Sequence, residues 1–177
     1  MKIMWPTLLA VVLGTGGSAW GQGAPRRLQD VESISAQSRR LTEDAAAAEI
    51  KGDSNTALRL ANQAATVDDT NPWAYYDRGA ALSQMGKTDD AVQAFRQAEE
   101  RFSSRNRWGH SIAIYGRAHA LDQARRCNEA RSAYLEYADF VQSYDQRSAD
   151  MARRYAAACG TAPVAAPAPA PAPKPQQ

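Results

Sequence analysis

Few residues of this chain could support chemistry near neutral pH. Two histidines, His110 and His119, are the ordinary candidates for a general base, and Cys127 and Cys159 are its two cysteines. The sequence contains no nucleophile elbow, no HExxH metalloprotease motif, no phosphate-binding loop and no dinucleotide fingerprint. It therefore predicts a protein that is not an enzyme and that holds no cofactor and no metal.

The composition indicates which elements must position these side chains. Of the 177 residues, 36 are alanine, the strongest helix former, whereas only seven are valine and five are isoleucine. This excludes a β-sandwich or barrel and predicts an all-α fold. The mean hydropathy of −0.54 excludes a multi-span membrane protein. The formal net charge is +2 and the two signs are interspersed, so we expect no nucleic-acid partner.

The N-terminal residues 1–21 are typical of a secretory signal peptide. Lys2 supplies the positive charge, a short apolar run follows it, and Ala19 and Gly21 supply small residues for cleavage. The run is shorter than the roughly 20 residues of a membrane span. We expect a periplasmic or secreted protein without stable membrane insertion after cleavage. The alternative is an anchor formed by an uncleaved N-terminal segment.

The C-terminal residues 161–177 hold six of the nine prolines, most of them alternating with alanine. Such a segment forms neither a helix nor a sheet strand. We predict a disordered Ala/Pro-rich tail, which serves either as a linker or as a docking arm for a proline-binding partner or the cell wall.

The residues between these ends repeat. Five positions of the middle segment recur earlier in the chain at a shift of 34: Tyr75, Gly79, Ala91, Phe95 and Ala98 align with Leu41, Ala45, Ala57, Ala61 and Ala64. The first four of these positions recur later at a shift of 39, where they align with Ile114, Ala118, Ala130 and Tyr134. Repeats therefore run over about 38–71, 72–105 and 111–144, with an insertion at 106–110 before the third. Within the middle repeat, Gly86 separates two stretches of helical periodicity.

The 34-residue period and the order of large and small residues resemble the tetratricopeptide repeat, most closely over residues 71–102. Asp44, Arg78 and Arg117 depart from the pattern, because the family has a leucine there. The resemblance implies an α-α superhelix of three helix-turn-helix repeats and a C-terminal capping helix at 145–159, about seven helices within residues 28–160. Residues 28–40 are expected to extend the first helix backwards over the end of the stack.

The stacking order implied by this resemblance places residue 159 opposite residue 125, two residues from Cys127. In an oxidising compartment this proximity predicts a Cys127–Cys159 disulfide. Closing a loop of about 32 residues would stabilise the fold by roughly 3.5 kcal/mol. The alternatives are two buried thiols, or a zinc site with His119 that lacks both a fourth ligand and a recognisable spacing.

By the same resemblance, the first helices of the repeats line a concave groove that binds a peptide or a partner protein. The residues expected in this groove are Arg39, Trp73, Tyr76, Tyr115, His119 and Asp122. An aromatic floor with an arginine suits an interface centre. The alternative for Trp73 and Tyr76 is packing in the core.

Three functions are compatible with these features. The first is a protein-interaction adaptor in the bacterial cell envelope. The second is a structural protein that self-associates through exposed aromatic residues such as Trp108. The third is an accessory subunit of an envelope or cell-wall enzyme complex.

Overall fold

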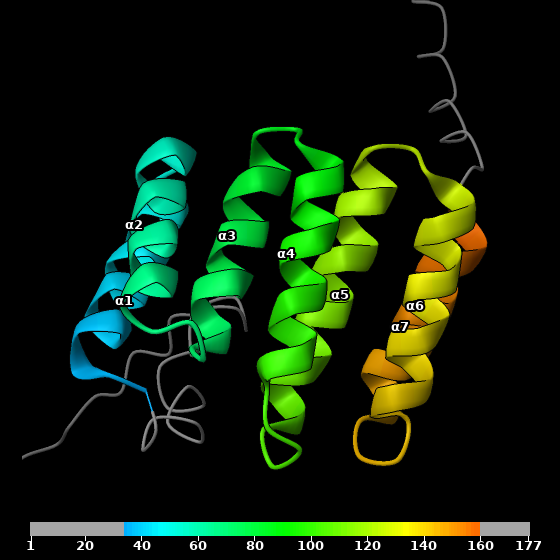
Figure 1. Ribbon diagram of the computed structural model, residues 1–177. Helices are drawn as coiled ribbons and strands as arrows, with labels where there is room; N and C mark the ends of the chain where they lie inside the picture. Colours follow the sequence, from blue (N-terminus) through cyan, green and yellow to red (C-terminus); the bar gives the residue numbers. More distant parts are fainter. Residues whose placement is uncertain (1–33, 160–177) are drawn as a thin grey trace, which may run out of the picture.

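A computed structural model describes residues 34–159, which form seven α-helices and no strand (Figure 1). The helices are α1 (Ala36–Ile50), α2 (Ser54–Val67), α3 (Pro72–Gln84), α4 (Thr88–Arg101), α5 (Arg107–Gln123), α6 (Cys127–Val141) and α7 (Gln146–Ala158). The predicted all-α fold is confirmed. The predicted signal peptide at 1–21 and the tail at 161–177 lie outside the described residues.

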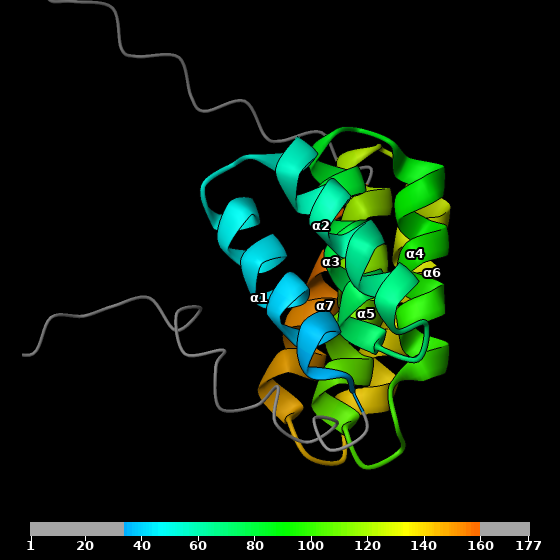
Figure 2. The same cartoon turned by 60° about the vertical axis from the view of Figure 1, so that its left-hand side comes forward.

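The helices form a stack in which each packs against the next along the chain (Figure 1). Three helical hairpins, α1–α2, α3–α4 and α5–α6, are followed by α7, which packs against α6. The first helices of successive hairpins also touch, α1 against α3 and α3 against α5, and Figure 2 shows this side of the stack from a second direction. This is the arrangement of a helical solenoid, and we call the face formed by the first helices its inner face, as the resemblance to the tetratricopeptide repeat implies.

Local sequence explains where the helices begin and where the hairpins turn. Five helices start after a Ser, Asp or Asn whose side chain accepts a hydrogen bond from a backbone N–H of the first turn, namely Ser35, Asp53, Asn71, Asn106 and Asp145. The turns of the first two hairpins contain Gly52 and Gly86, with φ of 76° and 71°. Arg125 takes the corresponding place in the third hairpin, with φ of 60°.

One expected helix start is wrong. Helix α1 does not continue backwards through residue 35, because Ser35 has ψ of 140° and caps α1 with its side chain. Residues 28–33 of that expected helix lie outside the described part of the chain. The inserted residues 106–110 begin the first helix of the third hairpin: Asn106 caps α5, and Arg107 to His110 form its first turn.

The core of the stack consists largely of alanine. Ala45 on α1, Ala57 on α2, Ala91 on α4, Ala118 on α5 and Ala130 on α6 are all completely buried. These small side chains allow neighbouring helices to approach closely, and the aromatic residues fill the remaining space. Within residues 34–159, no helix combines the length and the apolar character that crossing a membrane requires.

Candidate binding surface

Four tyrosines from three helices meet at the C-terminal end of the stack. Tyr115 of α5 lies against Tyr134 and Tyr137 of α6, with ring centroids 6.0 and 5.4 Å apart, and Tyr134 lies 5.5 Å from Tyr155 of α7. Tyr134 therefore contacts both Tyr115 of α5 and Tyr155 of α7. We call these four residues the tyrosine cluster. It joins α5 and α7, which lie on the inner face.

The cluster is buried on the α6 side and open on the α7 side. Tyr134 and Tyr137 are 1% and 9% exposed, Tyr115 is half-buried, and Tyr155 is 40% exposed. Burial raises the pKa of Tyr115 to about 12 and also raises the pKa of Tyr134 and Tyr137. These three tyrosines therefore stay uncharged at neutral pH, and the open side of the cluster presents ring surface.

His119 lies one turn after Tyr115 on α5. Its side chain is exposed, and its ring is nearly parallel to that of Tyr115, with centroids 6.2 Å apart and planes at 12°. His119 thus extends the surface of the tyrosine cluster along the inner face. The other histidine, His110, stacks on Phe140 with ring centroids 4.8 Å apart.

Asp122 makes contacts within the protein instead of standing free in the groove. Its Oδ1 accepts a hydrogen bond from Sγ of Cys159 at 2.9 Å, and its Oδ2 accepts one from the Tyr134 hydroxyl at 3.4 Å. These contacts tie the last turn of α5 to the end of α7. Of the predicted groove residues, Tyr115, His119 and Asp122 therefore lie together at one end of the stack.

Trp73 is a core residue, which corrects its predicted place on the groove surface. Its side chain is only 3% exposed, and its ring lies 4.9 Å from Phe102 and 5.7 Å from Trp108. Trp108, which was expected to be exposed, is half-buried by the same contact. The first turn of α5, formed by the inserted residues, brings Trp108 over Trp73.

The two remaining groove residues lie on other helices. Tyr76 of α3 is half-buried between Trp73 and Phe95, at ring distances of 5.9 and 5.7 Å. Arg39 of α1 is half-buried, and its backbone carbonyl accepts a hydrogen bond from the Thr42 hydroxyl. The six predicted residues are thus distributed over α1, α3 and α5 and form no single cluster.

Cys127 and Cys159 are close in space, as the stacking order predicted. Their sulfur atoms and a carboxylate oxygen of Asp122 all lie within 4.8 Å of one another. Cys127 is the first residue of α6 and is half-buried, whereas Cys159 follows α7 and is 6% exposed. Both are thiols in this structure, so the disulfide stays a prediction.

Sequence reasoning missed two features of this end of the stack. The first is the contact of Tyr155 with Tyr134: Tyr155 was expected on one face of the capping helix, but it was not expected to be part of the binding surface. The second is the contact between Asp122 and Cys159, which are 37 residues apart. The sequence did indicate that Cys159 lies near Asp122, because residue 159 was expected opposite residue 125, which is within one helical turn of Asp122.

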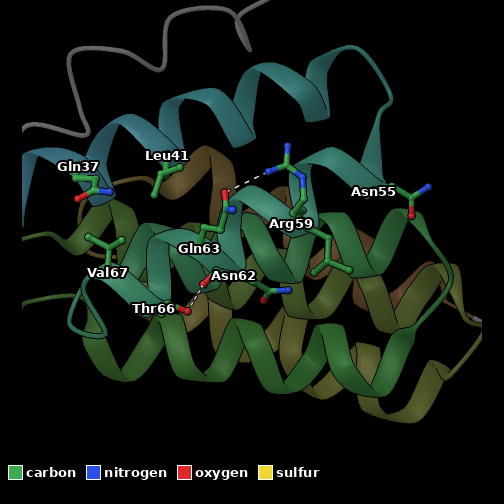
Figure 3. A pocket seen from close by; sticks show the side chains of 9 residues that line it. Gln37, Leu41, Asn55, Arg59, Asn62, Gln63, Thr66 and Val67 are labelled. Atoms are coloured by element: carbon green, nitrogen blue, oxygen red, sulfur yellow. Dashed lines mark hydrogen bonds between the residues drawn. The ribbon is translucent and has the colours of Figure 1, made fainter.

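The described residues also form two surface hollows away from the tyrosine cluster. One, of about 670 Å³, lies on α1 and α2 and is lined by Leu41, Leu58, Val67 and six polar side chains. Figure 3 shows these side chains, with Arg59 donating to Gln63 and the Thr66 hydroxyl donating to the carbonyl of Asn62. The other, of about 460 Å³, lies around Phe102, His110 and Phe140. None of the predicted groove residues lines either hollow.

Residues 60–93, which run from α2 through α3 into α4, match the family model described as tetratricopeptide repeat. This match overlaps the segment 71–102, on which the resemblance was strongest. No curated protein matches the chain.

Proposed function

The chain is a tetratricopeptide repeat protein, and we propose that it is a non-enzymatic adaptor that holds a peptide segment of a partner protein in the bacterial cell envelope. Tetratricopeptide repeats are generally protein–protein interaction modules. The envelope location is supported by the signal-peptide pattern of residues 1–21, with Lys2 before the apolar run and small residues at 19 and 21.

The observation that supports this proposal best is the open side of the tyrosine cluster. Tyr155 of α7 and His119 of α5 are exposed beside Tyr115 on the inner face of the stack. Large, rigid aromatic side chains with a polar atom lose little conformational entropy when they bind, which is why they are enriched at the centre of interfaces. The hydroxyl of Tyr155 can donate to a backbone carbonyl of an extended peptide, and the rings can pack against its side chains.

The two histidines support a binding role over catalysis. Each stacks on an aromatic ring, His110 on Phe140 and His119 on Tyr115. Such contacts suit recognition, whereas a general base is normally held by a hydrogen bond that orients it toward a nucleophile.

The test compares capture of envelope proteins by the full chain and by single variants. We expect Tyr155→Ala and His119→Ala each to weaken binding of the captured partner by at least about tenfold, since central aromatic residues dominate interface energies. Tyr144→Ala is the matched control, because Tyr144 is also exposed, at 45%, but packs beside Arg107 and Phe140 instead of in the tyrosine cluster. Equal affinity for all four proteins would reject the tyrosine cluster as the binding site.

The location has its own test. Expression of the full chain followed by cell fractionation and N-terminal sequencing should give a soluble envelope protein that lacks residues 1–21. An intact N-terminus in the membrane pellet would instead show the uncleaved anchor, and an intact chain in the cytoplasm would reject export.

A further inference from the structure

Two thiols and a carboxylate from three separate segments converge at the end of the stack. Cys127 begins α6, Cys159 follows α7, and Asp122 lies in the last turn of α5. Their sulfur and oxygen atoms lie within 4.8 Å of one another, and Cys159 donates to Asp122 at 2.9 Å. A disulfide needs sulfur atoms about 2.05 Å apart, so bond formation requires the two side chains to rotate toward each other.

We propose that Cys127 and Cys159 form a reversible disulfide clasp in which Cys127 reacts first, Cys159 resolves, and Asp122 accepts the proton of Cys159. The clasp goes beyond the proposed function, since it concerns how α7 is held and not which partner binds. Its formation does not depend on the identity of a partner.

The exposure of the two thiols sets the order of reaction. Cys127 is half-buried at the start of α6, so it is the more accessible of the two cysteines to an external reagent. Cys159 is 6% exposed and hydrogen-bonded to Asp122. Burial, followed by its contact with Asp122, raises the pKa of Cys159 to about 12, which keeps it a thiol at neutral pH.

The reaction needs an external disulfide, R–S–S–R, as oxidant. The thiolate of Cys127 attacks one sulfur, which forms Cys127–S–S–R and releases one R–S⁻. The Cys159 thiol then passes its proton to the Asp122 carboxylate, and its sulfur attacks Cys127 and releases the second R–S⁻. Two protein thiols lose two electrons, and the external disulfide gains them and becomes two thiols once both leaving groups are protonated.

The clasp would fix the last helix of the stack. α7 packs mainly on α6, and it carries Tyr155, the exposed member of the tyrosine cluster. A bond from the residue after α7 to the first residue of α6 closes a loop that contains both helices. Oxidation therefore restrains the end of the stack at which Tyr115 and Tyr155 both contact Tyr134.

The first experiment follows the reaction of the reduced full chain with oxidised glutathione by mass spectrometry. We expect a product lighter by two hydrogens, with a Cys127–Cys159 cross-link in its peptide map, and a melting temperature about 10 °C above that of the reduced chain. A chain that keeps both thiols under excess oxidised glutathione would overturn the proposal.

Variants test the order of reaction. In Cys159→Ser, glutathione should stay attached to Cys127, whereas Cys127→Ser should react at least about tenfold more slowly because its remaining thiol is buried. Asp122→Asn should let the mixed disulfide at Cys127 accumulate and slow closure by at least about tenfold, measured at a temperature where circular dichroism shows the reduced variant folded. Equal reaction rates of the two cysteine variants, or unchanged closure in Asp122→Asn, would overturn the assigned roles.

The same three groups could instead bind Zn²⁺ through two sulfurs and an oxygen. Isothermal titration of the reduced chain with zinc chloride distinguishes the two cases. Stoichiometric tight binding that prevents oxidation by glutathione would replace the clasp with a metal site. Oxidation at the same rate with and without zinc supports the clasp.

Discussion

Phe95 lies directly against Gly79: a Cβ atom on Gly79 would stand 2.9 Å from Cδ1 of the Phe95 ring. The same ring lies against Gly116, where a Cβ atom would stand 2.6 Å from Cε1. Phe95 is 2% exposed, so one side chain of α4 fills the space beside both α3 and α5. The contact shows why the repeat alternates small and aromatic residues, since the ring occupies the volume that the glycines leave.

Gly79→Ala should therefore destabilise the protein. Glycine to alanine in a helix interior is ordinarily stabilising by roughly 0.5–1 kcal/mol. Here the added methyl group must displace the Phe95 ring, and overpacking of this kind costs about 1–3 kcal/mol. Urea unfolding followed by circular dichroism should show a lower midpoint, and Gly116→Ala should lower it further because its contact is shorter.

Gln93→Ala is the control for this comparison. Gln93 lies on α4 with an exposed side chain, so its replacement should leave the midpoint nearly unchanged. A Gly79→Ala protein more stable than the parent would show that the ring moves without cost.

The sequence was sufficient to predict this part of the fold, because the positions of Gly79 and Phe95 recur with the period of the repeat. Residues that obey the period, such as Ala57 and Ala91, are completely buried, and the hairpins follow from that spacing. Side-chain orientation was harder to predict where the period is interrupted. The inserted residues place Trp108 over Trp73, which makes Trp73 a core residue, and no repeat unit contains that contact.

The tyrosine cluster could be predicted only in part for the same reason. Tyr115 was identified because it occupies a position of the repeat. Tyr155 lies in α7, which is half a repeat, so comparison of the three full repeats did not indicate that its ring lies against Tyr134. Contacts between the last repeat and its cap depend on tertiary packing that the period does not encode.

Trp73→Ala should lower the stability of the fold, because Trp73 is a core residue and not part of the binding surface. Trp73 is 3% exposed and packs edge-on against Phe102, and truncation of a buried tryptophan costs about 3–5 kcal/mol. Thermal unfolding should show a large drop for Trp73→Ala and a smaller one for the half-buried Trp108→Ala. An unchanged melting temperature for Trp73→Ala would contradict the burial of this residue in the core.

Arg117→Leu should destabilise the protein although the family has leucine there. Arg117 is 7% exposed, and its guanidinium donates to Glu99 and Glu136, in each case at 2.8 Å. Leucine would leave the Glu99 carboxylate, whose side chain is 13% exposed, without its cation. Breaking such a pair costs about 3 kcal/mol, and Glu99→Gln in the same chain should recover part of the loss.

This variant should also respond to pH in a defined direction. Burial raises the pKa of Glu99 even beside Arg117, and loss of the arginine raises it further. A carboxyl group with a higher pKa in the folded state favours folding when it is protonated, so its contribution is lost as the pH rises through that pKa. Chemical unfolding at pH 4 and pH 7 should therefore show a smaller penalty for Arg117→Leu at pH 4, and an equal penalty at both would contradict the role of Glu99.

Asp145 caps α7, and its replacement should loosen the end of the stack in a pH-dependent way. Its carboxylate accepts hydrogen bonds from the backbone N–H of Ser148 at 3.0 Å and from the Ser148 hydroxyl at 2.6 Å. These bonds, the side-chain one first, hold the pKa of Asp145 below its usual value of 3.8. Asp145→Ala should cost about 1 kcal/mol at pH 7, as the loss of a cap does.

An acidic group whose pKa is lower in the folded state than in the unfolded state stabilises the fold at pH values above its unfolded pKa. This contribution is lost as the pH falls through the folded pKa. The difference between Asp145→Ala and the parent should therefore shrink as the pH falls below about 3.8. Asp145→Asn is the matched control, because asparagine caps as well as aspartate does but does not titrate. Hydrogen exchange of the α7 amides should be fast in Asp145→Ala and slow in Asp145→Asn at pH 7, and equal protection in both would show that packing on α6 alone holds the helix.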